Sequence, residues 1–368
     1  MQQIILNQGI EVLQTILLEK GIKKFLLVCD SSYEYLLIRE EMEKITIPYI
    51  KFYDFTFNPL YEDVCKGIQT FLSEDCDAIV AVGGGSAMDV AKCIKLFCKM
   101  NSNECYLLQE YKNTKIPLFA VPTTAGTGSE STRYAVIYYN GEKQSVTHES
   151  IIPDYAILEP RVLGTLPDYQ RKCTMLDALC QGIESWWSVN STEESMKYSR
   201  IAIGLIMQNK NAYINENSME AAEKIMLAAN YAGRAINITQ TTAAHAMSYK
   251  LTSLYGIPHG HAVAVCLPEV WRYMICQTEH CIDVRGKEHL MNVFEDIAET
   301  MGQKDIGEAI QYFEEILKEF EMPKPLYKEK DLEVLTSSVN VVRLKNNPVL
   351  LTEESLYELY QNIMNREG

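Results

Sequence analysis

The chain has little positive charge, no long apolar run and no CxxC motif, and each absence argues against a class of protein. Its 34 Lys and Arg stand against 49 Asp and Glu, with a net charge of -15 and no basic stripe, so we expect neither nucleic acid nor a membrane surface as a partner. No apolar run reaches membrane-spanning length, and the first residues lack the basic start and cleavage site of a signal peptide. The eleven cysteines contain no CxxC pair, which predicts reduced thiols in a cytoplasmic protein.

The first part of the chain alternates β-rich runs with helical periodicity. The β-rich runs are residues 23–30, 77–85 and 116–124. Strands separated by helices predict a parallel sheet in an α/β layer. Residues 134–140 predict a further strand, with a turn at Asn140-Gly141.

The second part of the chain has a different character. From about residue 166, apolar residues recur at helical spacing, and Gly and Pro interrupt the chain near residue 164. A length of 368 residues is sufficient for two cores. We therefore expect an α/β domain over residues 1–164 and a helical domain over residues 165–368.

Two polar loops follow predicted strands and suit a nucleotide. The sequence VGGGSAMDVAK at 82–92 places three glycines before a helix, whose first N–H groups can bind a pyrophosphate. Its spacing is not GxGxxG, and a purely structural turn explains it equally well. The loop PTTAGTGSEST at 122–132 follows the next strand, and two such loops at one edge of a parallel sheet favour nucleotide binding. Asp30 ends an earlier strand, where a carboxylate favours NAD over NADP unless it is simply solvated.

Two separate segments carry the side chains of a candidate metal site. Asp177 and Gln181 are four residues apart in a predicted helix and share one face. His245, His259 and His261 fall within one short window. A single histidine usually has a structural role, but three together with Asp177 indicate convergence on a cation. One carboxylate and two imidazoles suit Fe(II) or Zn(II) with open coordination positions.

Three motifs resemble, in order, the iron-containing (group III) alcohol dehydrogenase family: GGGSAMDVAK, PTTAGTGSE and HAMSYKLTSLYGIPHGHA. The resemblance covers nearly the whole chain. It implies the dehydroquinate synthase-like fold of that family, in which a parallel-sheet α/β domain binds NAD(P). An all-α domain then binds a divalent metal, Fe(II) or Zn(II), and carries catalysis. The resemblance also implies a homodimer or a larger homo-oligomer.

The same resemblance assigns individual residues. Asp177, His245 and His259 match three of the four family metal ligands, whereas Gln181 stands where the fourth ligand is a histidine. Tyr249 stands where the family often has a further histidine. The positions that match cofactor contacts are Asn58, Gly84, Gly85, Ser86, Asp89, Thr123, Thr124, Thr127, Ser129 and Lys143.

The glutamine at position 181 raises the question of whether the site binds a metal. A glutamine oxygen is neutral, and it is a poorer ligand than imidazole for Fe(II) or Zn(II). Three remaining ligands and an open position are nevertheless sufficient for a catalytic site. We therefore expect a metal, bound more weakly than in the family, with a metal-free enzyme as the competing interpretation.

Two segments resemble a narrower branch, the phosphonoacetaldehyde reductases: residues 176–192 and the tail 339–354. Such an enzyme reduces phosphonoacetaldehyde to 2-hydroxyethylphosphonate, in phosphonate biosynthesis. The resemblance implies hydride transfer from NADH to the aldehyde, with a metal as Lewis acid. The anionic headgroup of this substrate needs a cation, and the candidates are Arg133, Lys250 and Arg343.

The proton source and the exact activity stay open at this point. The proton that completes the alcohol is expected to come through water, Tyr249 or the ribose hydroxyls, and His261 either lines the site or has a structural role. A general short-chain alcohol or diol dehydrogenase of the same family would prefer uncharged aldehydes. A non-catalytic NAD- or metal-binding protein would bind cofactor without turnover.

Overall fold

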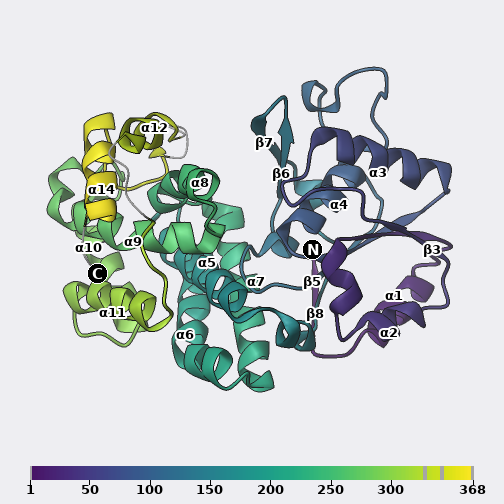
Figure 1. Cartoon of the computed structure of the whole chain (residues 1–368), viewed down its shortest axis with the longest axis horizontal. Helices are drawn as coiled ribbons and strands as arrows, with labels where there is room; N and C mark the ends of the chain where they lie inside the picture. The colour runs from purple at the N-terminus through teal and green to yellow at the C-terminus, as the bar shows by residue number, and fades with distance from the viewer. Residues whose placement is uncertain (1, 326–329, 340–343, 366–368) are drawn as a thin grey trace. The chain divides into compact units, whose positions relative to one another are not determined.

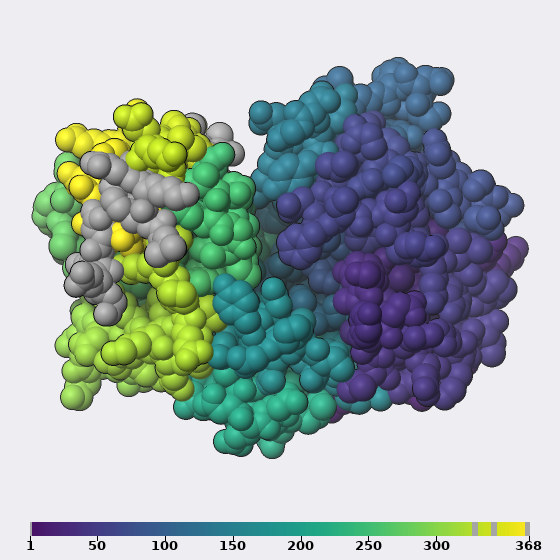
Figure 2. Space-filling model, in the orientation of Figure 1, coloured from purple at the N-terminus to yellow at the C-terminus, as the bar shows by residue number. Residues whose placement is uncertain are grey.

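The chain forms two compact units (Figure 1). The computed structural model describes residues 2–325, 330–339 and 344–365. The first unit comprises residues 1–167 and 215–233, and the second comprises residues 168–214 and 234–368. Figure 2 draws both units in space-filling form with the same colour scale.

The boundary differs from the division at residue 164 that the sequence suggests. Residues 165–167 stay with the first unit, and the segment Asn215–Gly233 joins it from further along the chain. Gly233 meets Gly128 backbone to backbone, and the Asn230 side chain donates to Glu130 at 3.1 Å. Helical periodicity shows that a helix has an apolar face, but it does not show which unit that face joins.

The first unit is built on a six-stranded parallel sheet in the order β1-β8-β5-β4-β2-β3. Its strands are β1 (Gln3–Leu6), β2 (Phe25–Cys29), β3 (Tyr49–Phe52), β4 (Ala78–Gly83), β5 (Leu118–Pro122) and β8 (Tyr155–Leu158). The four inner strands are buried throughout, which accounts for their nearly continuous apolar sequences. The parallel sheet predicted from three of these runs is confirmed.

Helices and one hairpin complete the first unit. The helices are α1 (Glu11–Glu19), α2 (Arg39–Glu43), α3 (Tyr61–Ser73) and α4 (Gly85–Phe97). The strands β6 (Tyr134–Tyr139) and β7 (Glu142–Thr147) pair antiparallel. Asn140 and Gly141 both have positive φ in the turn between them, so the predicted strand and turn are confirmed. α4 packs against β4, β5 and β6, which places its N-terminus at the end of β4.

The second unit is helical in its described residues, apart from loops, one short 3-10 turn and one isolated β-bridge. Its helices are α5 (Asp168–Trp187), α6 (Glu193–Asn215), α8 (Ala243–Tyr255), α9 (His259–Cys276), α10 (Gly286–Thr300), α11 (Ile306–Glu319), α12 (Asp331–Ser337) and α14 (Glu353–Asn365). α7 (Met219–Thr239) begins in the first unit and ends in the second. α9 packs against both α5 and α8.

An aromatic cluster lies in the core of the second unit. The ring centroids of Trp187, Trp271 and Phe294 are 5.6, 5.9 and 6.1 Å apart. This packing fixes the C-terminal turn of α5 against α9 and α10. Across the described residues, no helix has both the length and the apolar character that a membrane crossing requires.

Candidate functional site

The two predicted nucleotide loops lie side by side at the carboxyl edge of the sheet. β4 and β5 are neighbours, and the Thr123 N–H donates to the Gly83 carbonyl at 3.0 Å where both strands end. α4 starts at Gly85, and no side chain caps its N-terminus. Its first N–H groups can therefore bind a pyrophosphate, at the edge where such sheets hold ligands. The loops face each other through the pairs Gly84 with Thr124 and Gly85 with Thr127.

Asp30 and Asn58 belong to the same edge. Asp30 follows β2, which pairs with β4, and a Cβ atom on Gly83 would lie 3.4 Å from its Oδ2. The Ser86 hydroxyl donates to the Phe57 carbonyl, which brings the exposed Asn58 close to the start of α4. The structure therefore gathers Asp30, Asn58 and Ser86 around the glycine-rich loop.

Asp89 and Ser129 are occupied by contacts inside the protein. The Ser129 hydroxyl donates to Asp89 Oδ1 at 3.1 Å, and the Val136 N–H donates to Oδ2 at 3.0 Å. Burial raises the pKa of Asp89 to about 6, although the charges of Lys92 and Lys143 oppose that rise. Both side chains thus fasten the second loop and the hairpin to α4, and we expect them to support the cofactor loops from behind.

Lys92 is an anchor of the second loop that the sequence reasoning missed. Its ammonium is fully buried and donates to Ser129 Oγ, Thr132 Oγ1 and the Tyr134 carbonyl at 2.9, 3.0 and 2.7 Å. Burial lowers its pKa to about 8. The available signal was its spacing, because Asp89 and Lys92 are three residues apart on one face of α4.

Asp177, His245 and His259 come together in the second unit. They lie in α5, α8 and α9, and one ligand atom from each lies within 4.8 Å of the others. His245 Nε2 and His259 Nε2 are 3.3 and 4.0 Å from Asp177 Oδ1. Asp177 and His245 are buried, whereas the side chain of His259 is 35% exposed. A donor set of one carboxylate and two imidazoles suits a divalent cation.

Gly260 lets α9 begin directly against α5. A Cβ atom there would clash with the Cys173 carbonyl and would lie 2.9 Å from the Cβ of Asp177. Because His259 is the first residue of α9, this close approach determines where its imidazole lies relative to Asp177. The Ser248 hydroxyl, 3.3 Å from His259 Nδ1, holds the ring at its other nitrogen.

Electrostatic interactions keep Asp177 ionised. Burial alone would raise its pKa, but a hydrogen bond from His245 and the charges of both imidazoles bring the pKa below its usual value. Burial likewise opposes a charge on His245, yet Glu184 and Asp177 raise the pKa of this imidazole to about 9. A cation in the cluster must therefore displace the Nε2 proton of His245, which makes its binding depend on pH.

Glu184 is a buried carboxylate that the sequence reasoning overlooked. It is fully buried, and its Oε2 accepts a hydrogen bond from His245 Nδ1. Its Oε1 accepts from the Thr242 hydroxyl at 2.7 Å, and from the backbone N–H groups of Thr242 and His245 at 3.2 and 3.3 Å. The available signal was its place seven residues after Asp177, two turns along the same face of α5.

Gln181 contacts the cluster and has an unsatisfied oxygen. The residue is 4% exposed, and its Oε1 has no hydrogen-bond partner among the described residues. A hydrogen bond from Gln181 to Asp177 contributes to the low pKa of that carboxyl. A buried oxygen without a partner is costly, and a cation would satisfy it. The residues present therefore fit a divalent metal.

Tyr249 lies next to the metal cluster, whereas His261 lies outside it. Tyr249 stacks on His259 with ring centroids 5.3 Å apart, which puts it next to the cluster. His261 lies outside the cluster and is engaged at both nitrogens, by the Tyr169 hydroxyl at 2.7 Å and the Pro323 carbonyl at 2.8 Å. Neither nitrogen of His261 is free for proton transfer in this arrangement.

The three candidate cations for an anionic headgroup differ in how far other side chains already engage them. Arg133 forms an ion pair with Glu149, and its Nε donates to the Tyr134 hydroxyl at 3.2 Å. Lys250 lies in α8, five residues after His245, and its ammonium has no hydrogen bond or ion pair within the described part of the chain. Arg343 lies outside the described residues.

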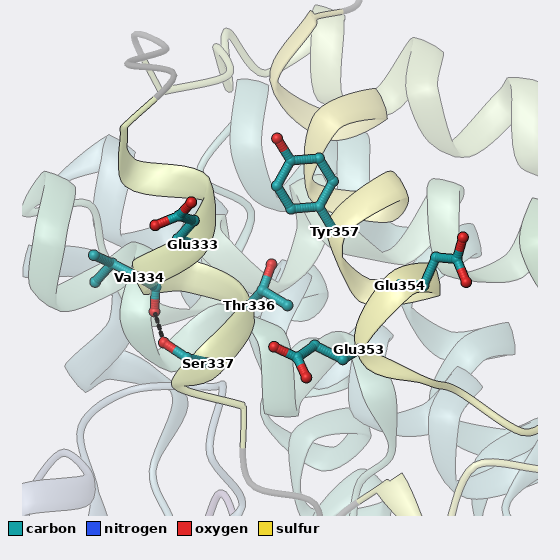
Figure 3. A pocket seen from close by; sticks show the side chains of 7 residues that line it. All are labelled: Glu333, Val334, Thr336, Ser337, Glu353, Glu354 and Tyr357. Carbon is teal, nitrogen blue, oxygen red and sulfur yellow. Dashed lines mark hydrogen bonds between the residues drawn. The ribbon is translucent and has the colours of Figure 1, made fainter.

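A separate pocket of about 600 Å³ lies between α12 and α14 (Figure 3). The described residues that line it include Glu333, Glu353 and Glu354 and no cationic side chain. It contains none of the predicted site residues, and its acidic lining would repel an anionic substrate. The metal cluster is the better candidate for the chemistry.

These features define a class of enzyme that combines a dinucleotide edge with a metal cluster. Residues 2–160 match the family described as iron-containing alcohol dehydrogenase, and residues 172–364 match the C-terminal part described for the same family. The chain belongs to the iron-containing alcohol dehydrogenase family. It is an NAD-dependent oxidoreductase that interconverts alcohols and aldehydes.

Individual relatives are similar over most of the chain. Phosphonoacetaldehyde reductase of Streptomyces viridochromogenes is 31% identical over 297 residues, which cover 77% of this chain and 75% of that protein. NAD-dependent methanol dehydrogenase of Bacillus methanolicus is 29% identical, covering 94% of this chain and 93% of that protein. A solved structure of sulfoacetaldehyde reductase from Bifidobacterium kashiwanohense in complex with NAD+ has a TM-score of 0.89 and 25% identity, over 100% of this chain and 98% of that chain. The predictions of fold and family are confirmed.

Proposed function

We propose that the chain reduces phosphonoacetaldehyde to 2-hydroxyethylphosphonate with NADH. The main support is the 31% identity to a phosphonoacetaldehyde reductase over 77% of this chain. A structural neighbour is named for sulfoacetaldehyde, and both substrates are two-carbon aldehydes with an anionic headgroup. A small aldehyde with a phosphonate or sulfonate group is therefore the substrate class that the relatives favour.

The two segments that resemble the reductase branch contact each other in the second unit. Asn190 donates to Asn346 Oδ1 at 3.0 Å, and Asn346 donates to Gln240 Oε1 at 3.0 Å. Gln240 has a φ of 60°, an uncommon conformation for a residue other than glycine. It lies in the turn before α8, the helix that carries His245. Hydrogen bonds between the two segments therefore stabilise the turn from which α8 begins.

NADH is proposed to bind at the carboxyl edge of the sheet in the first unit. The N–H groups at the start of α4 would bind its pyrophosphate. Asp30 would accept a hydrogen bond from the adenosine ribose and repel a 2'-phosphate, which favours NADH over NADPH. Thr123, Thr124 and Thr127 line the same edge.

Asp177, His245 and His259 are proposed to hold a divalent cation, Fe(II) or Zn(II), with Gln181 as the fourth ligand. When bound, the cation supplies Lewis-acid polarisation of the aldehyde carbonyl. Asp177 provides the anionic ligand, and the Gln181 oxygen gains the partner that it lacks. Tyr249, which stacks on His259, is proposed to donate the proton that converts the alkoxide left by hydride transfer into the alcohol.

Lys250 is proposed to bind the anionic headgroup. It lies on the helix that carries His245, about 7.5 Å further along the helix axis. Arg133 is the weaker candidate, because Glu149 already pairs with its guanidinium. A headgroup bound by Lys250 would share one rigid helix with a metal ligand, which would fix the carbonyl relative to the cluster.

A general short-chain alcohol dehydrogenase is the second candidate function. The methanol dehydrogenase relative covers 94% of this chain, more than the reductase relative does. The ion pair of Arg133 with Glu149 also removes one of the predicted headgroup cations. This alternative predicts that uncharged aldehydes are the better substrates.

The test compares NADH oxidation with phosphonoacetaldehyde and with propionaldehyde, followed by absorbance. We expect kcat/KM to be at least roughly tenfold higher for the phosphonate, which corresponds to ~1.4 kcal/mol of transition-state binding. Lys250→Met should remove most of this advantage and leave the rate with propionaldehyde unchanged, whereas Arg133→Gln should change neither. Equal rates with both aldehydes would reject the phosphonate in favour of the general dehydrogenase.

Location and assembly are proposed on a narrower basis. All eleven cysteines are free thiols, which supports a cytoplasmic location. The family resemblance supports a homodimer or a larger homo-oligomer, which light scattering of the purified chain would test.

A further inference from the structure

Glu184 lies behind His245, at the ring nitrogen opposite the metal cluster. We propose that Glu184 is a positioning residue of the metal centre, which keeps a proton on His245 Nδ1 so that Nε2 offers its electron pair to the cation. Because it acts on the metal centre proposed above, this role rests on the proposed function, but it does not depend on the identity of the aldehyde.

The direction of each hydrogen bond at Glu184 Oε1 follows from its partners. Trp187 Nε1 can only donate, and it donates to the Thr242 hydroxyl at 2.9 Å. The single hydroxyl proton of Thr242 is therefore directed to Oε1, at 2.7 Å. The backbone N–H groups of Thr242 and His245 also donate to Oε1, at 3.2 and 3.3 Å. Oε1 is surrounded by donors, so an oxygen must occupy this position.

The second oxygen then determines the tautomer of His245. Glu184 Oε2 contacts His245 Nδ1, and because a carboxylate only accepts, Nδ1 carries the proton. Nε2 lies 3.3 Å from Asp177 Oδ1, within the cluster. A carboxylate that accepts from a ligating histidine fixes the ring and makes its other nitrogen a stronger ligand.

The same carboxylate also fixes the backbone that carries the ring. Thr242 is the N-cap of α8, and its own side chain makes no capping hydrogen bond. Glu184 accepts from the backbone N–H of His245 in the first turn instead. It therefore holds both the main chain and the imidazole of His245, which two separate contacts would otherwise have to do.

Substitution by glutamine gives a specific expectation. In Glu184→Gln, the donors around Oε1 force the amide oxygen into that position, so the amide NH2 must face His245 Nδ1. The NH2 group then donates to Nδ1, and the imidazole proton moves to Nε2, the nitrogen that should face the cation. The shape of the side chain is unchanged, so the packing should be preserved.

The experiment measures Zn(II) affinity of the full chain by competition with a chelator, without substrate, and protonation of His245 by 15N NMR of labelled histidine. We expect Glu184→Gln to bind Zn(II) roughly 10- to 100-fold more weakly, with no proton on Nδ1. Glu184→Asp keeps an acceptor at Nδ1 and should lose less affinity. Glu269→Gln is the matched control, because Glu269 is also buried but bonds to Arg272 away from the cluster. The Zn(II) affinity of this variant should equal that of the wild type.

Three outcomes would overturn the role of Glu184: wild-type affinity in Glu184→Gln, a retained Nδ1 proton in that variant, or an equal loss in Glu269→Gln. If Glu184→Gln does not fold, a loss of affinity in Glu184→Asp as large as that in His245→Ala would also reject it. A wild-type chain that binds no Zn(II) or Fe(II) would reject both this role and the proposed metal centre. Normal metal binding with no turnover of phosphonoacetaldehyde would reject only the substrate.

Discussion

The nucleotide edge of the first unit and the metal cluster of the second are built in opposite ways. At the nucleotide edge, loops that follow neighbouring strands meet through backbone groups, as in the bond between Thr123 and Gly83. In the cluster, side chains from three helices converge and are held by a buried carboxylate, Glu184. If the two sites are as proposed, backbone geometry governs cofactor binding and a few side chains govern metal binding, and substitutions should separate the two.

Removing His245 should have the largest effect. In His245→Ala, we expect kcat to fall by roughly a thousandfold, ~4 kcal/mol, because the cluster loses a ligand. Bound metal should be lost as well, while the dissociation constant for NADH stays unchanged. Steady-state kinetics, metal analysis and a fluorescence titration with NADH measure these quantities. His280→Ala, at an exposed position, is the control. A parallel loss of NADH affinity would show that the two regions are not separable.

Gly260→Ala should disturb the cluster without removing a ligand. The added methyl group pushes α9 away from α5, and overpacking of this kind typically lowers the free energy of unfolding by about 1–3 kcal/mol. Since His259 begins α9, Zn(II) affinity should also fall, by roughly tenfold. Denaturant unfolding and chelator competition measure both effects. Gly204→Ala in α6, where a Cβ atom meets nothing within 4 Å, should leave Zn(II) affinity unchanged and should raise the free energy of unfolding slightly, because alanine favours a helix more than glycine does.

Lys92→Met tests whether the buried Lys92 ammonium supports the second polar loop at the carboxyl edge of the sheet. The substitution removes the Lys92 donor from two hydroxyls of the second loop and from the Tyr134 carbonyl in β6, which should lower the free energy of unfolding by about 1–3 kcal/mol. The loosened loop should raise the KM for NADH several-fold, with Zn(II) affinity unchanged. Lys95→Met is the matched control, because Lys95 is buried in the same helix but pairs with Asp154. It should lose stability while the KM for NADH stays the same, and an equal rise in both variants would speak against a specific anchor.

Asp30→Ala should have the smallest effect. Removing one partly exposed carboxylate near the ribose should raise the ratio of kcat/KM with NADPH to kcat/KM with NADH by roughly fivefold. This ratio corresponds to ~1 kcal/mol, the energy expected for one pair of charges in a solvated site. Kinetics with both cofactors, at low and at high salt, would measure it. An unchanged cofactor preference would place the ribose elsewhere.

Local patterns were sufficient for β2, β4, β5, β6 and the two polar loops of the first unit, but they revealed neither β1, β3 and β8 nor the segment Asn215–Gly233 that joins it. The buried strands are short apolar runs, and the turn at Asn140-Gly141 follows from residues that tolerate positive φ. The two polar loops could be paired before the structure was known, because the ends of adjacent parallel strands share one edge. Such features depend on neighbours in sequence and on the regular geometry of a sheet.

The partners of buried polar groups could not be predicted in the same way. Glu184 shares a face of α5 with Asp177, but this spacing does not reveal its bond to His245, which spans 61 residues. His261 shares its window with two candidate ligands, yet Tyr169 and Pro323 occupy its nitrogens from 92 and 62 residues away. Spacing shows which side chains share a helix face, whereas tertiary packing decides which of them meet.

The discontinuous first unit has a consequence for how the protein is made. A ribosome releases residues 1–167 long before the segment Asn215–Gly233 that belongs with them. Until that segment emerges, Gly128 lacks its backbone neighbour, and Glu130 and Ser131 lack the hydrogen bonds from Asn230. The usual order, in which the N-terminal domain folds first, therefore cannot be completed here. The first unit becomes whole only after two helices of the second unit, α5 and α6, have already been synthesised.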